Sequence, residues 1–385
     1  MPHQASVFGQ ILKQVPWADF DDLVAEHGSD WRVRRLPTKS QFVALLYAQL
    51  SGAESLREIT TGLESHRARL YHLGARPVQR STLADANAKR PSDVFAGLFA
   101  ALSGRLHRGL RRRVEETTYL LDATTVRVSG LGSDWAHFSH KMRGAKAHIV
   151  YDPDADCPVY SVVTPARTND VAVAQALPIE PGATYVFDLG YYDFRWWLRL
   201  HEAGCRIVTR FKANTPLEEA VERPLAGDCA DILSDLEGRL PRRQAKQRRN
   251  PFSDPVREIT VRIETGKTLR ILTNDLTAPA REIADLYKRR WAIELFFRWI
   301  KQTLKIRKFL GNSENAVRIQ IAVALIAYLL LRLAQETQSA VKEPLRFARL
   351  IRANLFHGKR LDRLLEPEKT SFPDPRQMVL HDLQS

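Results

Sequence analysis

The order of strand-like and helix-like segments between Thr117 and Phe211 constrains the fold of this chain more than any other feature. Three runs rich in strand-forming residues come first, TTYLLDATTVRV, KAHIVYD and PVYSVVTPAR, each bounded by turn formers. The helix-like piece NDVAVAQAL then leads to the strand TYVFDLGYYD, the helix FRWWLRLHEAG and the strand CRIVTRF. This order predicts a mixed α/β sheet flanked by helices.

Changes in composition and in the helix-like or strand-like pattern of apolar residues divide the chain into five segments. Residues 1–115 read as an N-terminal helical domain, and 116–212 as the first part of the core. Residues 213–269 break the alternation and are predicted as a β-rich insertion. Residues 270–345 return to the core and include the helix around Glu294. Residues 346–385 form a C-terminal helix and a polar tail.

The N-terminal helices can be interpreted in two ways. The stretch from Ser55 to Arg90 can form a helix-turn-helix in which Ser81 caps a helix bearing Asn87, Lys89 and Arg90. An ordinary helical bundle with a solvated basic face fits the same residues. The sequence therefore marks this region as a possible DNA-binding domain without deciding between the two.

The net charge favours a polyanionic partner. The chain has a formal charge of +14 and a pI near 9.8, so nucleic acid is the first candidate, although non-specific binding or an anionic membrane surface would fit the charge equally. The most apolar stretch, Ile321–Leu331, is too short to span a bilayer, and we expect a buried core helix with no membrane partner. Three cysteines, at positions 157, 205 and 229, form neither a close pair nor a zinc pattern, which fits a reducing cytoplasm.

Two aspartates lie among strand-forming apolar residues. Asp122 stands in TTYLLDATTV and Asp188 in TYVFDLG, and burying an unpaired carboxylate is costly. For either residue alone, a solvated strand end or an arginine partner is the simpler explanation. Two such residues in one predicted sheet favour a divalent-cation site, because Mg²⁺ binds a few carboxylate oxygens and keeps several waters. Glu294, in an apolar helix with cations nearby, is the candidate for a third carboxylate.

The helix around Glu294 gathers polar groups on one face. At about 100° per residue, Tyr287, Arg290, Glu294 and Lys301 fall within an arc of roughly 60°, and two further cations, Arg298 and Lys305, lie on or near that arc. A surface helix laced with Arg–Glu pairs would need nothing more. However, this face has only one acid among several cations. That arrangement is better explained by a metal-binding carboxylate that lies beside the phosphates of a nucleic acid backbone.

These residues resemble a known family. The spacing Y-x(2)-R-x(3)-E-x(6)-K marks the insertion-sequence-four branch of the DDE transposases of bacterial insertion sequences, and Tyr287, Arg290, Glu294 and Lys301 match all four residues and all three gaps. The resemblance extends over most of the chain, from the LREI segment through DATTV and VFDLGYYD to the helix that carries LGNSENAVRIQIAVALIAYLLL.

The resemblance implies a function and a site. Asp122, Asp188 and Glu294 would be catalytic residues and ligands of two Mg²⁺ ions, which Mn²⁺ can replace, on a ribonuclease-H-like fold. The partners would be double-stranded DNA, as terminal inverted repeats and as target, held by a homodimer in the bacterial cytoplasm and nucleoid. The resemblance also implies that DNA is contacted by the cations and the tyrosine of the helix: Tyr287, Arg290, Arg298, Lys301 and Lys305.

One departure concerns hairpin formation, for which some relatives use a tryptophan in the inserted domain to stack on a flipped base. No tryptophan lies between Trp197 and Trp291, and Phe211 and Phe252 are the only aromatic residues between 202 and 286. The hairpin step and its stacking residue therefore remain open.

Three other functions compete with transposition. A transposase-derived DNA-binding protein that no longer cuts is one, and a ribonuclease-H-type nuclease that never joins DNA is another. A zinc enzyme, built on histidines 137, 140 and 148, is weaker because their spacing matches no common ligand pattern.

Overall fold

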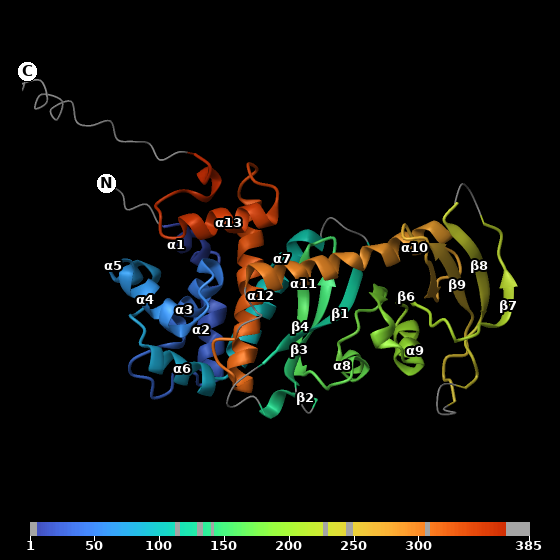
Figure 1. Ribbon diagram of the computed structural model, residues 1–385, viewed down its shortest axis with the longest axis horizontal. Coiled ribbons are helices and arrows are strands. Elements are labelled where there is room, and N and C mark those ends of the chain that lie inside the picture. The colour runs from blue at the N-terminus through green and yellow to red at the C-terminus, as the bar shows by residue number, and fades with distance from the viewer. Residues whose placement is uncertain are drawn as a thin grey trace, which may run out of the picture.

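The computed structural model describes residues 6–111, 116–128, 134–139, 142–225, 230–243, 249–304 and 309–366. A body of helices at one end adjoins a long twisted sheet that reaches to the other end (Figure 1). The mixed α/β class and the flanking helices predicted from the sequence are confirmed.

The helical body contains the N-terminal helices and two from the C-terminal part of the chain. These are α1 (Val7–Leu12), α2 (Trp17–Glu26), α3 (Thr38–Ser51), α4 (Leu56–Ser65), α5 (Arg67–Leu70), α6 (Arg80–Lys89), α7 (Asp93–Arg111), α12 (Glu314–Glu336) and α13 (Pro344–Asn354). Helix α12 packs against α3, α6 and α7, so that it forms the centre of the body.

Helix α12 contains the apolar stretch singled out in the sequence. Within the described ranges it is the one helix long and apolar enough to cross a membrane, and 78% of its most apolar window is buried inside the protein. The prediction of a buried core helix is thus confirmed, because neighbouring helices and strand β4 cover its apolar sides.

The sheet has ten strands in the part of the chain that the structure describes, and nine of them follow the order β2-β3-β1-β5-β6-β10-β9-β8-β7, with β4 paired to β3. Their bounds are β1 (Thr118–Arg127), β2 (His137–Ser139), β3 (Met142–Asp152), β4 (Cys157–Pro165), β5 (Thr184–Phe187), β6 (Arg206–Arg210), β7 (Glu218–Glu222), β8 (Ile232–Arg239), β9 (Val256–Arg262) and β10 (Thr268–Thr273). Strands β1, β5 and β6 run parallel, and β3 and β10 flank them antiparallel. The expected succession of three strands, helix, strand, helix and strand is present as β1, β3, β4, α8 (Asp170–Ala176), β5, α9 (Phe194–Glu202) and β6.

The strands predicted as an insertion extend this same sheet. Strand β10 pairs with β6 on one side and with β9 on the other, and β8 and β7 continue outward. A buried ion pair secures the extension: Arg257 and Asp235 are 3% and 2% exposed, and Arg257 also donates to the carbonyl of Ala278. Removing one member of such a pair leaves an uncompensated buried charge, which costs about 3–5 kcal/mol.

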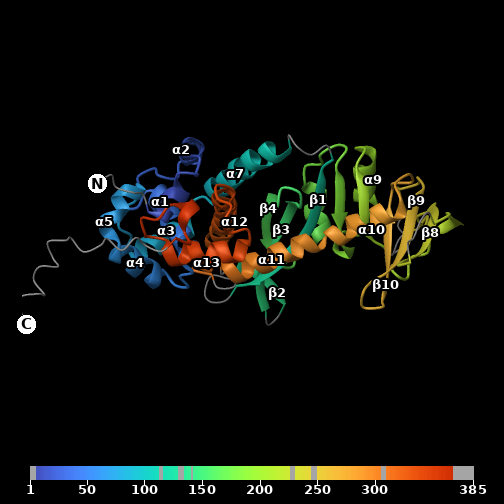
Figure 2. The ribbon, with the colours of Figure 1, turned by 90° about the horizontal axis from the view of Figure 1, so that it is seen from above.

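Two apolar cores lie on opposite faces of the sheet. Helices α8 and α9 cover one face, where Trp196 and Trp197 pack with Phe187. On the other face lie α10 (Ala280–Arg289) and α11 (Trp291–Thr303), which run nearly end to end from the far strands to the helical body (Figures 1 and 2). Alternate residues of each strand therefore face different helices.

The long helix predicted around Glu294 is two helices joined at Arg290. The Arg290 N–H donates to the Tyr287 carbonyl over 3.1 Å, and Ile293 N–H donates to the Arg290 carbonyl over 3.3 Å. Both bonds span three residues, so the turn tightens there. From its residue type Thr277 could cap this helix and Pro279 could begin it, but Pro279 occupies the N-cap of α10 and Thr277 donates to Asp275.

Candidate active site

Asp122 and Asp188 lie side by side on neighbouring parallel strands. Leu121 of β1 is the register partner of Phe187 of β5; Asp122 follows Leu121 within β1, and Asp188 directly follows Phe187, the last residue of β5. Neighbouring strands are about 4.8 Å apart. Because Asp188 keeps an extended backbone, alternation directs both carboxylates to the face that α11 covers. The structure thus brings the two predicted aspartates together.

Asp188 sits at a tight turn. It is the N-cap of a short 3₁₀ helix, Leu189–Tyr191, and its Oδ1 accepts a hydrogen bond of 2.8 Å from the Gly190 N–H. A Cβ on Gly190 would stand 2.9 Å from this same oxygen. The absence of a side chain at Gly190 therefore lets the backbone hold the Asp188 carboxylate closely.

Glu294 reaches the aspartates through Arg290. The Arg290 guanidinium lies 2.5 Å from Glu294 Oε1 and 3.8 Å from Asp122 Oδ2. It is also within 5.8 Å of the Tyr287 ring, and its Nε is buried with no hydrogen-bond partner among the described residues. One buried cation therefore bridges the first and third predicted carboxylates.

The charged groups of this cluster lie close together, and burial together with this proximity shifts the pKa values of Asp122 and Tyr287. The pKa of Asp122 is raised to about 6, chiefly by burial; the neighbouring charges of Asp188 and Glu294 contribute to this rise, while the Ala123 N–H and Arg290 oppose it. Burial also raises the pKa of Tyr287, which Arg290 partly offsets. These neighbours are close enough to influence one another's protonation.

The donor set fits a divalent cation in its chemistry. Asp122 and Asp188 present adjacent carboxylates whose repulsion and burial a cation would relieve. Within the described ranges, no three side chains of His, Cys, Asp or Glu are grouped closely enough to hold one ion together. Glu294 is instead engaged by Arg290 in this conformation.

The predicted DNA-contacting residues are dispersed over α10 and α11. Tyr287 is only 8% exposed, Arg290 is largely buried, Lys301 is half-buried, and Arg298 points outward. Lys305 lies outside the described residues. Arg298 and Lys301 are therefore the described cations of this helix face that solvent can reach.

A second polar cluster, which no sequence motif indicated, lies behind Asp188. Lys146 donates to Asp170 over 2.8 Å, and the buried His148, which bonds Thr164, lies 3.6 Å from the same Asp170 oxygen. Asp170 Oδ2 would also be 3.3 Å from a Cβ on Gly190. The detectable signal was the two-residue spacing of Lys146 and His148, which places both side chains on one strand face.

This cluster bears on the zinc alternative. Burial lowers the pKa of His148 to about 4. Its Nε2 bonds Thr164, whereas its Nδ1, 3.6 Å from Asp170, is buried with no hydrogen-bond partner among the described residues. His140 lies outside the described residues, and the side chain of His137 is not described either. No metal-binding group of three such residues exists in the described part of the chain.

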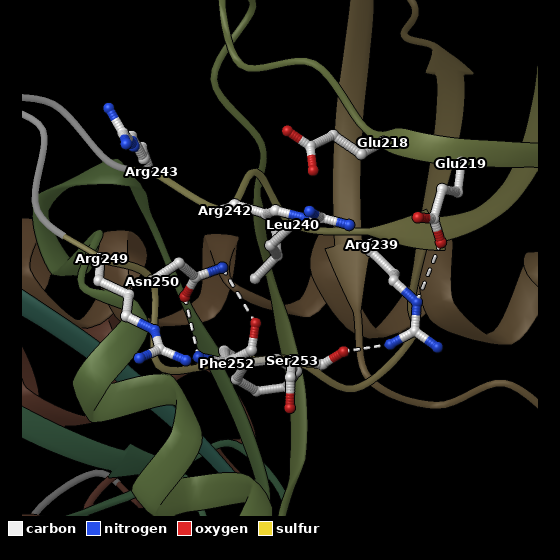
Figure 3. Close-up of a pocket in the computed structure, with 10 residues that line it drawn as sticks. All are labelled: Glu218, Glu219, Arg239, Leu240, Arg242, Arg243, Arg249, Asn250, Phe252 and Ser253. Carbon is white, nitrogen blue, oxygen red and sulfur yellow. Dashed lines mark hydrogen bonds and ion pairs between the residues drawn. The ribbon is translucent and has the colours of Figure 1, made fainter.

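A cavity of about 790 Å³ opens in the sheet extension, beside strands β7 and β8 (Figure 3). Four arginines line it: Arg239, Arg242, Arg243 and Arg249. Arg239 is engaged by Glu219 over 3.2 Å and by the Ser253 carbonyl. Three of these arginines, at positions 242, 243 and 249, belong to the basic stretch PRRQAKQRRN, of which residues 244–248 lie outside the described residues.

Comparison with known proteins gives matches over most of the chain. Residues 114–330 match the transposase DDE domain, and residues 3–76 match a domain of unknown function. The transposase-like protein y4zB of Sinorhizobium fredii is 43% identical over 294 residues, which cover 76% of this chain and 81% of that protein. The transposase assigned to insertion sequence element IS5377 of Geobacillus stearothermophilus is 30% identical over 283 residues, 72% and 73% of the two chains. Among solved structures, the piggyBac transposase synaptic complex with hairpin DNA aligns with a TM-score of 0.44 and 11% identity, over 98% of this chain and 82% of that one.

Proposed function

The chain belongs to the DDE transposase family, and from this membership we propose that it cuts and rejoins DNA with Asp122, Asp188 and Glu294 as its catalytic carboxylates. The observation that supports this assignment is the pairing of Asp122 and Asp188 on adjacent parallel strands, with Glu294 joined to Asp122 through Arg290. The matching spacing of Tyr287, Arg290, Glu294 and Lys301 supports placement in the insertion-sequence-four branch.

We assign the three carboxylates to two divalent ions, Mg²⁺ or Mn²⁺. Such ions supply Lewis-acid stabilisation of charge on the attacking and leaving oxygens of a phosphodiester. The chain's own residues position the DNA. Arg290, released from Glu294, would neutralise a phosphate beside the cut, and Lys301 would neutralise the next, with Tyr287 ordering the Arg290 guanidinium.

The DNA substrates follow from the same proposal. They would be the terminal inverted repeats of an insertion sequence and a target duplex, held by a homodimer so that two ends meet, in the bacterial cytoplasm. Arg298 lies exposed on α11 and adds a backbone contact. Arg242 and Arg249 in the extension cavity would add further contacts that carry no sequence information.

The decisive variant is Glu294→Gln, which removes one negative charge while preserving the size of the side chain. We expect loss of Mg²⁺-dependent cleavage of a plasmid that carries this coding region with its flanking DNA, while binding to the same DNA in EDTA persists. Glu202→Gln, on an exposed position of α9, is the matched control and should cleave as the wild type does. Full cleavage by Glu294→Gln would remove Glu294 from the site.

Two further outcomes separate the competing functions. A wild-type chain that binds DNA but cleaves none with Mg²⁺ or Mn²⁺ would be a catalytically silent DNA-binding protein. A chain that cleaves but never joins a 3′-hydroxyl end to target DNA would be a nuclease of the ribonuclease-H type. Transposition requires both activities from the same preparation.

A further inference from the structure

A groove in the helical body is lined by a basic loop and by helix α6. The loop, residues 27–37, connects α2 to α3, and the groove has a volume of about 500 Å³. We propose that this N-terminal groove binds the phosphate backbone of duplex DNA. The inference rests on the proposed function, and it assigns a DNA-contacting surface to a part of the chain that precedes all three carboxylates.

The charge of the N-terminal groove points to a polyanion. Arg32, Arg34 and Arg35 of the loop and Lys89 of α6 line it and are exposed. Among the described residues, none of these four cations forms an ion pair with a carboxylate, and Asp85 is the one acid in the lining. On an ordinary protein surface such cations are interspersed with acidic residues. In the groove the four cations lie together, and they remain available to bind an anion.

The loop that carries these arginines is held in place by buried polar contacts. Asp30 Oδ1 accepts from both the N–H and the hydroxyl of Thr38 over 2.7 Å, at the start of α3. Arg90, itself 8% exposed, donates to the Leu36 carbonyl and to Gln41 over 2.9 Å. Residues 29–38 are thereby anchored at both ends, so the backbone that carries the exposed arginines does not need to be ordered on binding.

The centre of the loop has two features that are unfavourable for the stability of the isolated protein, an exposed aromatic side chain and a strained backbone. Trp31 is 71% exposed, and the Arg32 guanidinium stacks on its ring at 4.1 Å. Arg32 also has a left-handed backbone, φ +57°, although it is not a glycine. Backbone strain of this kind is concentrated at functional surfaces. Arg32, stacked on Trp31, is one of the residues that line the groove.

The helix-turn-helix interpretation is corrected by the same contacts. Gln79 is the N-cap of α6, with no side-chain cap, and Ser81 lies inside the helix. Asn87 is 4% exposed and bonds Gln41 over 2.8 Å, while Arg90 is committed to Leu36 and Gln41. Arg90 lines the groove, and because both side chains are buried and engaged, neither can reach a base edge. Lys89 remains exposed.

Salt dependence of duplex binding tests the groove directly. The full chain is titrated against a fluorescein-labelled 30-bp duplex of mixed sequence in EDTA, across about 50–200 mM NaCl. We expect the triple variant Arg32→Ala, Arg34→Ala, Arg35→Ala to bind more weakly, with a log–log salt slope shallower by about 2.7, or 0.9 for each phosphate that the variant no longer neutralises. Over that range the wild type should then lose roughly 40-fold more affinity than the variant.

A second triple variant controls for net charge. Lys13→Ala, Arg57→Ala, Arg67→Ala removes three exposed cations of the same helical body outside the groove, and its slope should stay close to that of the wild type. Circular dichroism should show both triples folded, because all six side chains are exposed.

The outcomes separate this inference from the proposed function. The proposal that the groove binds DNA would be overturned by equal salt slopes for the two triple variants, or by a wild-type protein that binds no duplex. A groove triple with the expected weakening, in a chain whose Glu294→Gln variant cleaves fully, would uphold the groove and refute the assignment of the carboxylates.

Discussion

Asp122 is an ionised group in an unfavourable place. Its folded-state pKa is about 6, against an ordinary value of 3.8, and burial is the largest cause. Between these two pH values the folded protein holds more protons at Asp122 than the unfolded chain does. The free energy of unfolding therefore decreases as pH rises through this window, and the cost is complete above about pH 6.

We predict that Asp122→Asn makes the protein more stable at pH 7. The rise from 3.8 to about 6 corresponds to at most about 3 kcal/mol. Urea unfolding at pH 7 and pH 4 measures the effect, which should shrink at the lower pH because the wild-type carboxyl is then protonated. A gain of equal size at both pH values would show that something other than charge is responsible.

Mg²⁺ should mimic this stabilisation in the wild type only. A cation between Asp122 and Asp188 offsets their repulsion, and a ligand that binds only the folded state raises its stability. Unfolding with and without Mg²⁺, for the wild type and for Asp122→Asn, provides the comparison. Stabilisation of both proteins to the same degree would contradict a cation at Asp122.

The candidate site residues could be predicted where a residue was unusual for its sequence surroundings. Asp122 and Asp188 stood out as acids within apolar strand runs, and the structure places them together. The bridging position of Arg290 and the approach of Asp170 to Gly190 were not predictable. Both depend on the rotamers and packing of segments that lie far apart in the chain.

At the scale of elements, helices α10 and α11 share one polar face despite the tightened turn at Arg290. Lys301 lies two turns beyond Glu294 and is half-buried. The expected contact with a DNA phosphate therefore comes from a side chain that the helix already orients in part.

We predict that Lys301→Ala weakens binding of duplex DNA and makes the salt slope shallower by about 0.9, the share of one phosphate. Fluorescence anisotropy over a salt series measures it. Arg195→Ala is the matched control, because Arg195 is an exposed cation on α9, which covers the opposite face of the sheet. An unchanged salt slope for Lys301→Ala would show that Lys301 contacts no DNA phosphate and is an ordinary residue on the helix surface.

The kinds and order of elements were predictable, because periodicity depends on local sequence. Their boundaries were less so. Thr277 has the right chemistry for a cap, but Asp275 accepts its N–H and hydroxyl, and Pro279 takes the cap position. The continuation of the sheet through β10 into β9 was also missed, since strand pairing between distant segments leaves little trace in either segment alone.

At the scale of the whole molecule, the first described helix and the residues that follow α13 meet in the helical body. Phe8 N–H donates to the Leu355 carbonyl over 2.8 Å. The Phe356 ring, 7% exposed, stacks on His66 at 3.7 Å and contacts Phe8 and Tyr47 at 6.0 and 5.7 Å. The N-terminal helices thus depend on residues that follow α13.

We predict that Phe356→Ala destabilises the protein by about 3–5 kcal/mol, because it leaves a cavity among aromatic side chains. Denaturant unfolding followed by circular dichroism measures the change. Leu365→Ala, at a position 46% exposed, should change stability by less than about 0.5 kcal/mol. Comparable destabilisation in the two variants would show that the C-terminal segment is not docked as described.

The bridge formed by Arg290 has a consequence for when the protein can act. In the structure this guanidinium is a counter-ion for both Asp122 and Glu294, so a Mg²⁺ ion that binds these carboxylates would compete with a tethered cation of high local concentration. A phosphodiester entering the site offers the guanidinium another anion, and the vacated carboxylates then attract the metal. Substrate and metal would thus load cooperatively, which would keep a free enzyme in a magnesium-rich cell from cutting DNA indiscriminately.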